Sequence, residues 1–323
     1  GNATASQAVT VTVTDVYEPS QPNHFVDLNA SVNLEMIWVE PGTFTMGKVG
    51  FAEPERNVTL TKGFYLGKFE VTQAQYKIVM SGNTDGLSDM PSGFSGGLDL
   101  PVENVSWDDA KVFLSRLNEL DSASNDDGWK YDLPTEAEWE YACRAGSQSA
   151  YSWGNEINST RANYNWSGTH HMNTLVSVAV GQYPPNQWGF YDMHGNVFEW
   201  VNDWYQDPYP NAGQVVDPVG PSSSPYKVRR GGSLVSFDQF VESASRDRSW
   251  THVRDSKIGF RVAYRQITIP PTDLNITAPL TIAENQSIGT VVGEFNATDP
   301  DTGATLAFQL VSGAGDVNNA LFT

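Results

Sequence analysis

Apolar residues recur with a period of two in short runs along the chain, and such alternation predicts half-buried β-strands. The stretch MIWVEPGTFTMG (Met36–Gly47) contains one alternating run, a Pro-Gly turn and a second run. Near the N-terminus Val and Thr alternate strictly from Val9 to Val13, which predicts one strand with a buried and an exposed face. Beyond residue 269 the sequence again favours three or four short strands.

Helices are predicted by their capping residues. Thr72, Ser106 and Thr135 each precede a helical run, and each side chain can accept a hydrogen bond from a free amide of the first turn. Glu138 lies three residues after Thr135 and completes a capping box. The remaining sequence is rich in Gly, Pro, Asn and Trp, so we expect long loops held in place by aromatic side chains.

The third of these helices carries the single cysteine of the chain. It should run to about Ala145, with Gly146 in the left-handed conformation that ends it. Trp139, Ala142 and Cys143 fall on one face, which predicts a core stripe. We interpret Cys143 as a buried hydrophobe rather than a nucleophile, because no His or Lys lies near it in sequence.

Charge narrows the choice of partners. The 323 residues include 19 basic and 38 acidic ones, for a formal net charge of −19. Such a field repels nucleic acid and anionic lipid, which excludes both as main partners. No apolar run reaches the ~18 residues that a transmembrane helix needs, so we expect no membrane insertion. One cysteine allows no internal disulfide, and a secreted domain without disulfides fits a bacterial surface protein better than a eukaryotic ectodomain. We expect an extracellular or cell-surface location, in bacteria.

Blocks in a fixed order resemble the formylglycine-generating enzyme, or sulfatase-modifying factor, family. The resemblance covers roughly Leu34 to Arg265 and implies an α+β, C-type-lectin-like fold with little regular secondary structure. We assign this module to residues 20–268. The blocks that carry the resemblance are Met36–Gly47, Phe64–Tyr76, Leu100–Phe113, Leu133–Gly146 and Trp188–Tyr205.

The closing segment of the module begins with RRGGS (Arg229–Ser233) and ends with IGFR (Ile258–Arg261). In the family this segment holds two cysteines that bind copper and serve the oxidation of a substrate cysteine. Here no cysteine lies between Ser233 and Phe260. Because soft thiolates hold and select cuprous ions, we expect neither copper nor formylglycine formation. The family also has an active-site serine that matches Ser233, and a tryptophan where this chain has Phe198.

A calcium site is predicted in YDMHGNVFEW. Asp192, Asn196 and Glu199 flank a Gly-Asn turn and offer the oxygen ligands that calcium prefers. The resemblance implies a structural calcium ion held by Asp192, Glu199 and the backbone carbonyls of Gly195 and Val197. The alternative is a capped turn that leads into an inward-packed strand.

The resemblance also implies a second calcium site that begins at Asn163 and the Tyr164 carbonyl. Its later ligands fall where the spacing departs from the family, and only Asn173 offers an oxygen there. The neighbouring His170 and His171 suggest a zinc or iron site, but adjacent residues of a strand point to opposite faces. We interpret these histidines as surface or turn residues.

The flanks resemble pieces of bacterial cadherin-like repeats, which are β-sandwiches. Residues 1–19 resemble the last strand of one repeat, and residues 269–323 resemble the first half of another; whether the two ends pair is left open. Glu284, Asp299 and Asp301 match positions that lie near calcium in such repeats, although an Asx-rich turn is an equal alternative. The chain is thus expected to be a piece of a longer surface protein.

Two function classes remain. The closing segment resembles that of retroelement-diversified variable proteins, which predicts a non-catalytic module that binds a protein or glycan ligand. The alternative is that the aromatic residues of this segment are buried in the core and bind no partner. The second class is a metal-dependent oxidoreductase or protein-modifying enzyme of the same family, which would need at least three nitrogen or thiolate ligands. The predicted ligand contacts are Val235, Ser236, Phe237, Phe240, Val241, Ser249, Trp250 and His252.

Overall fold

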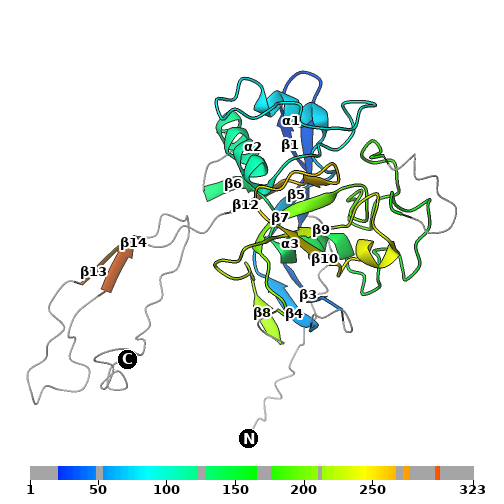
Figure 1. The fold of residues 1–323 in the computed structure, drawn as a ribbon. Helices are drawn as coiled ribbons and strands as arrows, with labels where there is room; N and C mark the ends of the chain where they lie inside the picture. Colours follow the sequence, from blue (N-terminus) through cyan, green and yellow to red (C-terminus); the bar gives the residue numbers. More distant parts are fainter. Residues whose placement is uncertain are drawn as a thin grey trace, which may run out of the picture.

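The largest sheet contains strands from both ends of the module. The computed structural model describes residues 21–48, 54–122, 128–165, 176–209 and 213–266, and two strands beyond them. The sheet has the order β1–β2–β5–β12–β6, and all neighbouring strands are antiparallel (Figure 1). β12 therefore closes the sheet between β5 and β6. The strands are β1 (His24–Asp27), β2 (Asn33–Val39), β5 (Phe64–Gly67), β12 (Ala263–Gln266) and β6 (Trp129–Asp132).

A second sheet of order β10–β9–β7–β11 carries the closing segment. β11 runs parallel to β7, whereas β9 is antiparallel to both β7 and β10. Because β9 and β11 lie on either side of β7, one strand holds both framework blocks of the segment. These strands are β7 (Phe198–Trp204), β9 (Lys227–Arg230), β10 (Arg246–Ser249) and β11 (Ile258–Phe260), and a 3-10 helix η2 (Asp238–Val241) lies between β9 and β10.

The third sheet is small. It has the order β3–β4–β8, with β8 parallel to β4. The two runs predicted around the Pro-Gly turn are thus confirmed as strands, but β2 and β3 belong to different sheets. The strands are β3 (Gly42–Met46), β4 (Arg56–Leu60) and β8 (Gln214–Val216).

The helices begin where the sequence predicts. Thr72, Ser106 and Thr135 are the N-caps, and each forms a reciprocal capping box with the residue three positions on. The third helix ends one residue earlier than predicted, because Ala145 is already left-handed (φ 46°) ahead of Gly146 (φ 87°). The helices are α1 (Gln73–Met80), α2 (Trp107–Leu120) and α3 (Glu136–Arg144).

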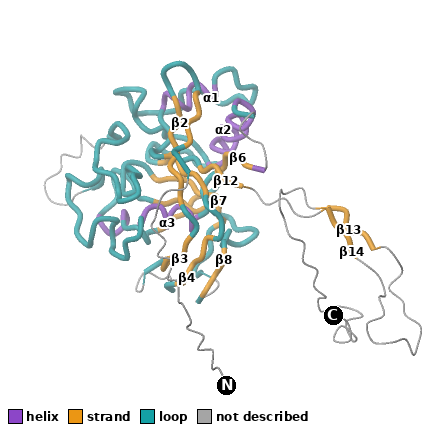
Figure 2. The backbone as a smooth tube through the Cα atoms, turned by 180° about the vertical axis from the view of Figure 1, so that it is seen from behind, coloured by secondary structure: helices purple, strands orange, loops and turns teal. Residues whose placement is uncertain are grey.

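Two apolar clusters form the core. One joins α1 and α2 to β7 and β11, and the other packs α3 against β3, β4 and β7. Trp139, Ala142 and Cys143 are fully buried in the second, which confirms the predicted stripe. Loops make up much of the chain between these elements (Figure 2). The fold is mixed α+β with few helices, as expected.

Beyond the module the structure describes one antiparallel pair, β13 (Thr272–Ile276) with β14 (Phe295–Thr298). Residues 1–19 and the acidic positions Glu284, Asp299 and Asp301 lie outside the described residues. No helix in the described part of the chain is long and apolar enough to cross a membrane.

Candidate ligand-binding site

A cavity of about 370 Å³ opens between the closing segment and the face of the β7–β9–β10 sheet. Phe237 and Phe240, each 47% exposed, stand at its edge. Below them the Arg229 guanidinium lies 4.3 Å from the centre of the Phe198 ring and pairs with Asp247 at 2.8 Å. The cavity therefore combines an aromatic rim with a charged pair beside an aromatic floor. Its lining residues are Phe198, Val235, Ser236, Phe237, Phe240, Ser245, Arg246 and Asp247.

Two glycines fix how the segment leaves β9. Gly231 and Gly232 are both left-handed, with φ of 85° and 71°. A Cβ on Gly232 would lie 2.5 Å from Val241 Cγ1 and 2.6 Å from the Phe240 carbonyl oxygen, so the backbone and η2 are in direct contact. This contact presses Val241 inward and leaves Phe237 and Phe240 outward.

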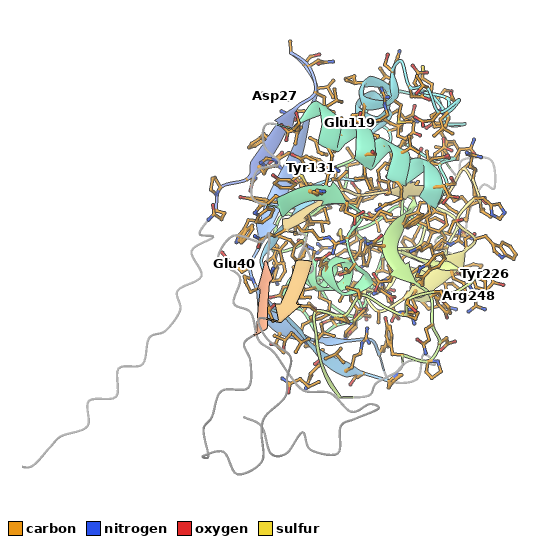
Figure 3. The ribbon with its side chains drawn as sticks, turned by 90° about the vertical axis from the view of Figure 1, so that its left-hand side faces the viewer. Asp27, Glu40, Glu119, Tyr131, Tyr226 and Arg248 are labelled. Atoms are coloured by element: carbon orange, nitrogen blue, oxygen red, sulfur yellow. The ribbon has the colours of Figure 1, made fainter. Side chains whose placement is uncertain are left out.

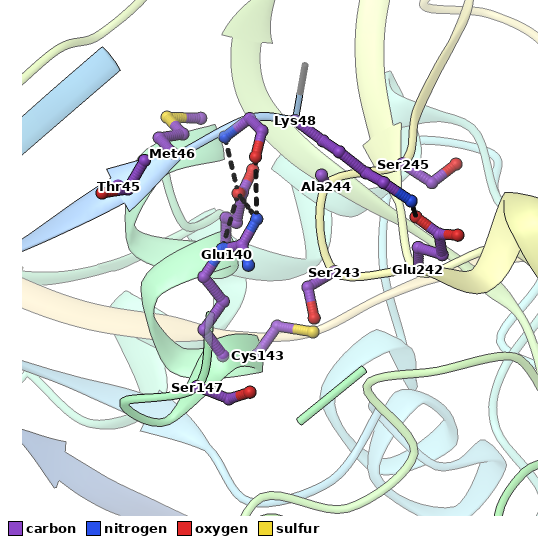
Figure 4. A network of polar contacts seen from close by, with 12 residues as sticks. Thr45, Met46, Lys48, Glu140, Cys143, Ser147, Glu242, Ser243, Ala244 and Ser245 are labelled. Atoms are coloured by element: carbon purple, nitrogen blue, oxygen red, sulfur yellow. Dashed lines mark hydrogen bonds and ion pairs between the residues drawn. The ribbon is translucent and has the colours of Figure 1, made fainter. Parts of the chain in front are cut away.

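Buried charges tie the segment to α3. Arg230 is fully buried, pairs with Glu140 and donates to the Ser243 carbonyl at 2.9 Å. Glu140 also accepts from Arg144 and from the Gly47 amide, both at 2.9 Å (Figure 4). Because a buried charge is tolerated only with its partners, this network sets the position of the segment's return to β10.

Not all of the predicted contacts reach the surface. Val241 is completely buried, so its assignment to the ligand face was wrong: the turn at Gly232 packs it into the interior. Ser236 lies at the cavity wall but is only 8% exposed, and its hydroxyl accepts a hydrogen bond from the Ser233 amide at 3.0 Å. Ser236 is therefore part of the framework as well. Val235 is half-buried at the cavity.

The remaining contacts lie at the other end of β10. Trp250 is 51% exposed and His252 is exposed, but neither lines the cavity. Trp250 packs instead against Tyr226, with ring centres 5.2 Å apart, and Arg248 lies over the Tyr226 ring. Ser249 is half-buried within β10. Sequence reasoning missed Tyr226 and Arg248, although Tyr226 directly precedes β9, the strand that leads into the RRGGS block.

The predicted calcium region gathers several buried carboxyl groups around one arginine. Glu199 forms an ion pair with Arg261 at 2.8 Å, which the sequence did not indicate. It also accepts a hydrogen bond from the Trp139 indole at 2.7 Å. Burial raises the pKa of Glu70 well above its ordinary value, and the neighbouring Asp192 and Glu199 carboxylates raise it further. Burial likewise raises the pKa of Asp192 to about 6. One guanidinium thus faces three carboxyl groups.

The calcium assignment stays a prediction, and two carboxylate oxygens here have lone pairs available for it. Asp192 Oδ2 accepts from the Gly181 amide at 2.7 Å, but its buried Oδ1 has no partner among the described residues. Each Glu199 oxygen has two lone pairs, so Oε1 keeps one beside its Arg261 bond. No group of three acidic, histidine or cysteine side chains in the described ranges is arranged to hold a metal alone, so the Gly195 and Val197 carbonyls would have to contribute.

The second predicted calcium site is only partly within view. Asn163 donates to the Val176 carbonyl and to Asn196 Oδ1, both at 3.1 Å, and its own carbonyl accepts from the Asn196 amide. Tyr164 is buried. Asn173, His170 and His171 lie outside the described residues.

Cys143 is buried, as predicted, next to a histidine that sequence reasoning did not connect with it. Its thiol lies 3.6 Å from His194 Nε2, and His194 Nδ1 lies 2.8 Å from the Val241 carbonyl oxygen. Burial raises the pKa of Cys143 to about 12 and lowers the pKa of His194 to about 4. Both groups are therefore neutral at physiological pH, and a buried thiol is a poor nucleophile.

Comparisons with known proteins bear on the family and the fold. Residues 24–266 match the sulfatase-modifying factor enzyme 1-like domain. The formylglycine-generating enzyme of Streptomyces coelicolor is 34% identical over 185 residues, which cover 53% of this chain and 55% of that enzyme. The chaperone protein LppX of Paenibacillus barcinonensis is 32% identical over 222 residues, covering 56% of this chain and 75% of its own length.

Among solved structures, variable protein 1 of Treponema denticola superposes with a TM-score of 0.64 and 27% identity, covering 75% of this chain and 99% of its own. The fold prediction is thus confirmed by a family match and by a structural match to a variable protein. This chain belongs to the sulfatase-modifying factor, or formylglycine-generating enzyme, family.

Proposed function

We propose that this module is a non-catalytic ligand-binding module, and that the cavity with its rim of Val235, Phe237 and Phe240 is its binding face. The exposure of the two phenylalanines beside the cavity carries the proposal. Full burial of a phenylalanine side chain contributes about 1.5–3 kcal/mol, so a partner that covers the exposed half of each gains roughly 1 kcal/mol per ring. Clustered exposed aromatics beside a cavity are typical of partner-binding surfaces.

The separation of rim from framework supports a display role. Arg230, Gly232 and Val241 hold the segment through buried contacts, whereas about half of each Phe237 and Phe240 side chain is exposed. Side chains of the second kind can vary without unfolding the first. The likeness to a protein named a variable protein supports the same inference, which includes diversification of the rim positions by a retroelement.

Calcium enters this proposal as a structural ion. Asp192, Glu199 and the Gly195 and Val197 carbonyls would hold it, and its charge would offset the carboxylate excess around Arg261. We further infer that the module acts at a bacterial cell surface or outside the cell, between cadherin-like repeats that hold it away from the cell, and binds a protein or a glycan. The acidic net charge of −19 supports partners other than nucleic acid.

A selection experiment tests the binding face. A random-peptide display library and an array of neutral and acidic oligosaccharides are probed with the parent protein and with the double variant Phe237→Ser, Phe240→Ser. Phe25→Ser is the matched control, because Phe25 is 53% exposed and lies on β1, in the largest sheet rather than beside the cavity. We expect ligands that bind the parent and the control but do not bind the double variant.

Binders that recognise all three proteins equally would place the binding face elsewhere. The enzymatic alternative is tested on the same preparation by metal analysis and by incubation with a cysteine-containing sulfatase peptide. Stoichiometric copper or iron together with turnover of the peptide would replace the binding proposal by an enzymatic one.

A further inference from the structure

An arginine and four aromatic rings form a continuous stack outside the cavity. The Arg248 guanidinium lies 4.6 Å from the Tyr205 ring centre and 5.4 Å from that of Tyr226. Tyr226 contacts Trp250 at 5.2 Å, and Trp250 stacks on His252 at 6.5 Å. Figure 3 shows Tyr226 and Arg248 together at the edge of the molecule. We call these five residues the aromatic–arginine ladder.

Arg248 differs from every other arginine of the closing segment. Six arginines lie between Arg229 and Arg261. The other five each pair with a carboxylate, whereas none of the described acidic residues pairs with the exposed Arg248. The chain has 38 acidic residues for 19 basic ones, so a shortage of carboxylates does not explain this. Tyr205 shares a side-chain hydrogen bond with this guanidinium, the rings hold it at the surface, and its remaining donors face no described carboxylate.

A guanidinium held in this way is prepared for an incoming carboxylate. Its planar donors match a carboxylate in a bidentate geometry, and fixing the side chain beforehand reduces the entropy lost on binding. Trp250, 51% exposed, provides an apolar surface beside it. Trp, Tyr and Arg are also the residues that dominate binding energy at protein–protein interfaces.

The position of the ladder suits an extended chain. Among the described residues, β10 is the outermost strand of its sheet and pairs with β9 alone. The Arg248 amide is already satisfied by the Asp247 side chain at 2.7 Å, so a partner segment here would bind through side chains rather than by pairing with this amide. A partner segment can therefore lie along β10, between the cavity and Trp250.

We propose that the ladder is a docking surface for an acidic segment of a partner protein, which places an Asp or Glu carboxylate on Arg248 and an adjacent apolar side chain on Trp250 and Tyr226. The inference rests on the proposed function and names the partner chemistry for its second half. It concerns residues other than those that line the cavity, so the two can fail separately.

The test uses the same random-peptide display library, panned on the parent protein, and the recovered peptides are sequenced and titrated. We expect enrichment of an acidic residue next to an apolar one. Arg248→Gln should lower the affinity of these peptides about tenfold, because one charge-assisted hydrogen-bonded contact is lost. Trp250→Ala should weaken them as well. Arg161→Gln should not, because Arg161 is likewise exposed over a tryptophan ring, that of Trp153, but far along the chain from the ladder.

Recovery of no peptides, or of peptides without acidic residues, would overturn the inference, as would equal binding to Arg248→Gln at an unchanged melting temperature. Acidic oligosaccharides that bind the parent and not Arg248→Gln, without any peptide doing so, would overturn the assignment to a protein partner. If the peptides no longer bind the Phe237→Ser, Phe240→Ser variant but still bind Arg248→Gln, the proposed function stands and this inference fails.

Discussion

Replacing Gly232 by alanine should destabilise the module far more than an ordinary surface substitution. Gly232 has φ 71°, and a Cβ there would lie 2.5 Å from Val241 Cγ1 and 2.6 Å from the Phe240 carbonyl oxygen. A non-glycine residue in the left-handed region costs roughly 1–2 kcal/mol. Forcing extra volume against a packed neighbour costs about 1–3 kcal/mol more, and here a backbone oxygen must move with η2. The expected loss for Gly232→Ala is therefore about 2–5 kcal/mol.

Gly82→Ala separates the two contributions. Gly82 has φ 66°, but a Cβ there would meet nothing within 4 Å, so only the conformational cost applies. Urea unfolding of the parent and both variants gives the free energies directly. We expect a loss of about 1–2 kcal/mol for Gly82→Ala and a clearly larger one for Gly232→Ala. Equal losses would mean that η2 does not pack on the Gly-Gly turn, and the account of why Val241 is buried would fail.

Other consequences follow from the same structure. Chelator should lower the melting temperature and added calcium should restore it. At a calcium concentration a hundredfold above Kd, binding should stabilise the fold by about 2.7 kcal/mol. If Asp192→Asn keeps the full response to calcium, the predicted site is wrong. Burial raises the pKa of Asp203 to about 7, above its ordinary value of 3.8, so unfolding releases a proton and stability should fall as pH rises from about 4 to 7; Asp203→Asn should flatten this slope in pH-dependent urea unfolding, and an unchanged slope would contradict the assignment. Phe237→Ser should cost about 1 kcal/mol because half of the ring is already buried, whereas the fully buried Val241→Ala should cost about 1–3 kcal/mol, and the reverse order would refute the division into rim and framework. With copper and a sulfatase-type peptide, mass spectrometry should detect no formylglycine, because the closing segment has no thiolate pair.

Local features of the fold were predictable from sequence, whereas the inward or outward direction of loop residues was not. Thr72, Ser106 and Thr135 act through bonds to residues three positions away, so the sequence alone is enough to find them. Val235 and Val241 could not be told apart, because an irregular loop has no period from which to infer a buried face. The turn at Gly232 decides the matter.

Contacts between distant segments were equally hidden. Glu70 lies just after β5, more than a hundred residues before Asp192 in the sequence. In the structure the two carboxyl groups are close enough for Asp192 to raise the pKa of Glu70. Tyr226 meets Trp250 only because β9 and β10 are paired. The resemblance to the enzyme family indicated where the closing segment lies, but tertiary pairing determines which of its side chains can meet a partner.

The central claim is that the rim of the closing segment is free to vary and bind while its framework is not. Two display libraries test it most directly: one randomises the rim residues Val235, Phe237 and Phe240, and the other randomises Gly232, Ser236 and Val241. Both are sorted first for protease resistance and then for binding to one chosen unrelated protein. We expect most members of the first library to stay folded and some to bind, and most members of the second to unfold. Equal loss of folding in both libraries would contradict the claim.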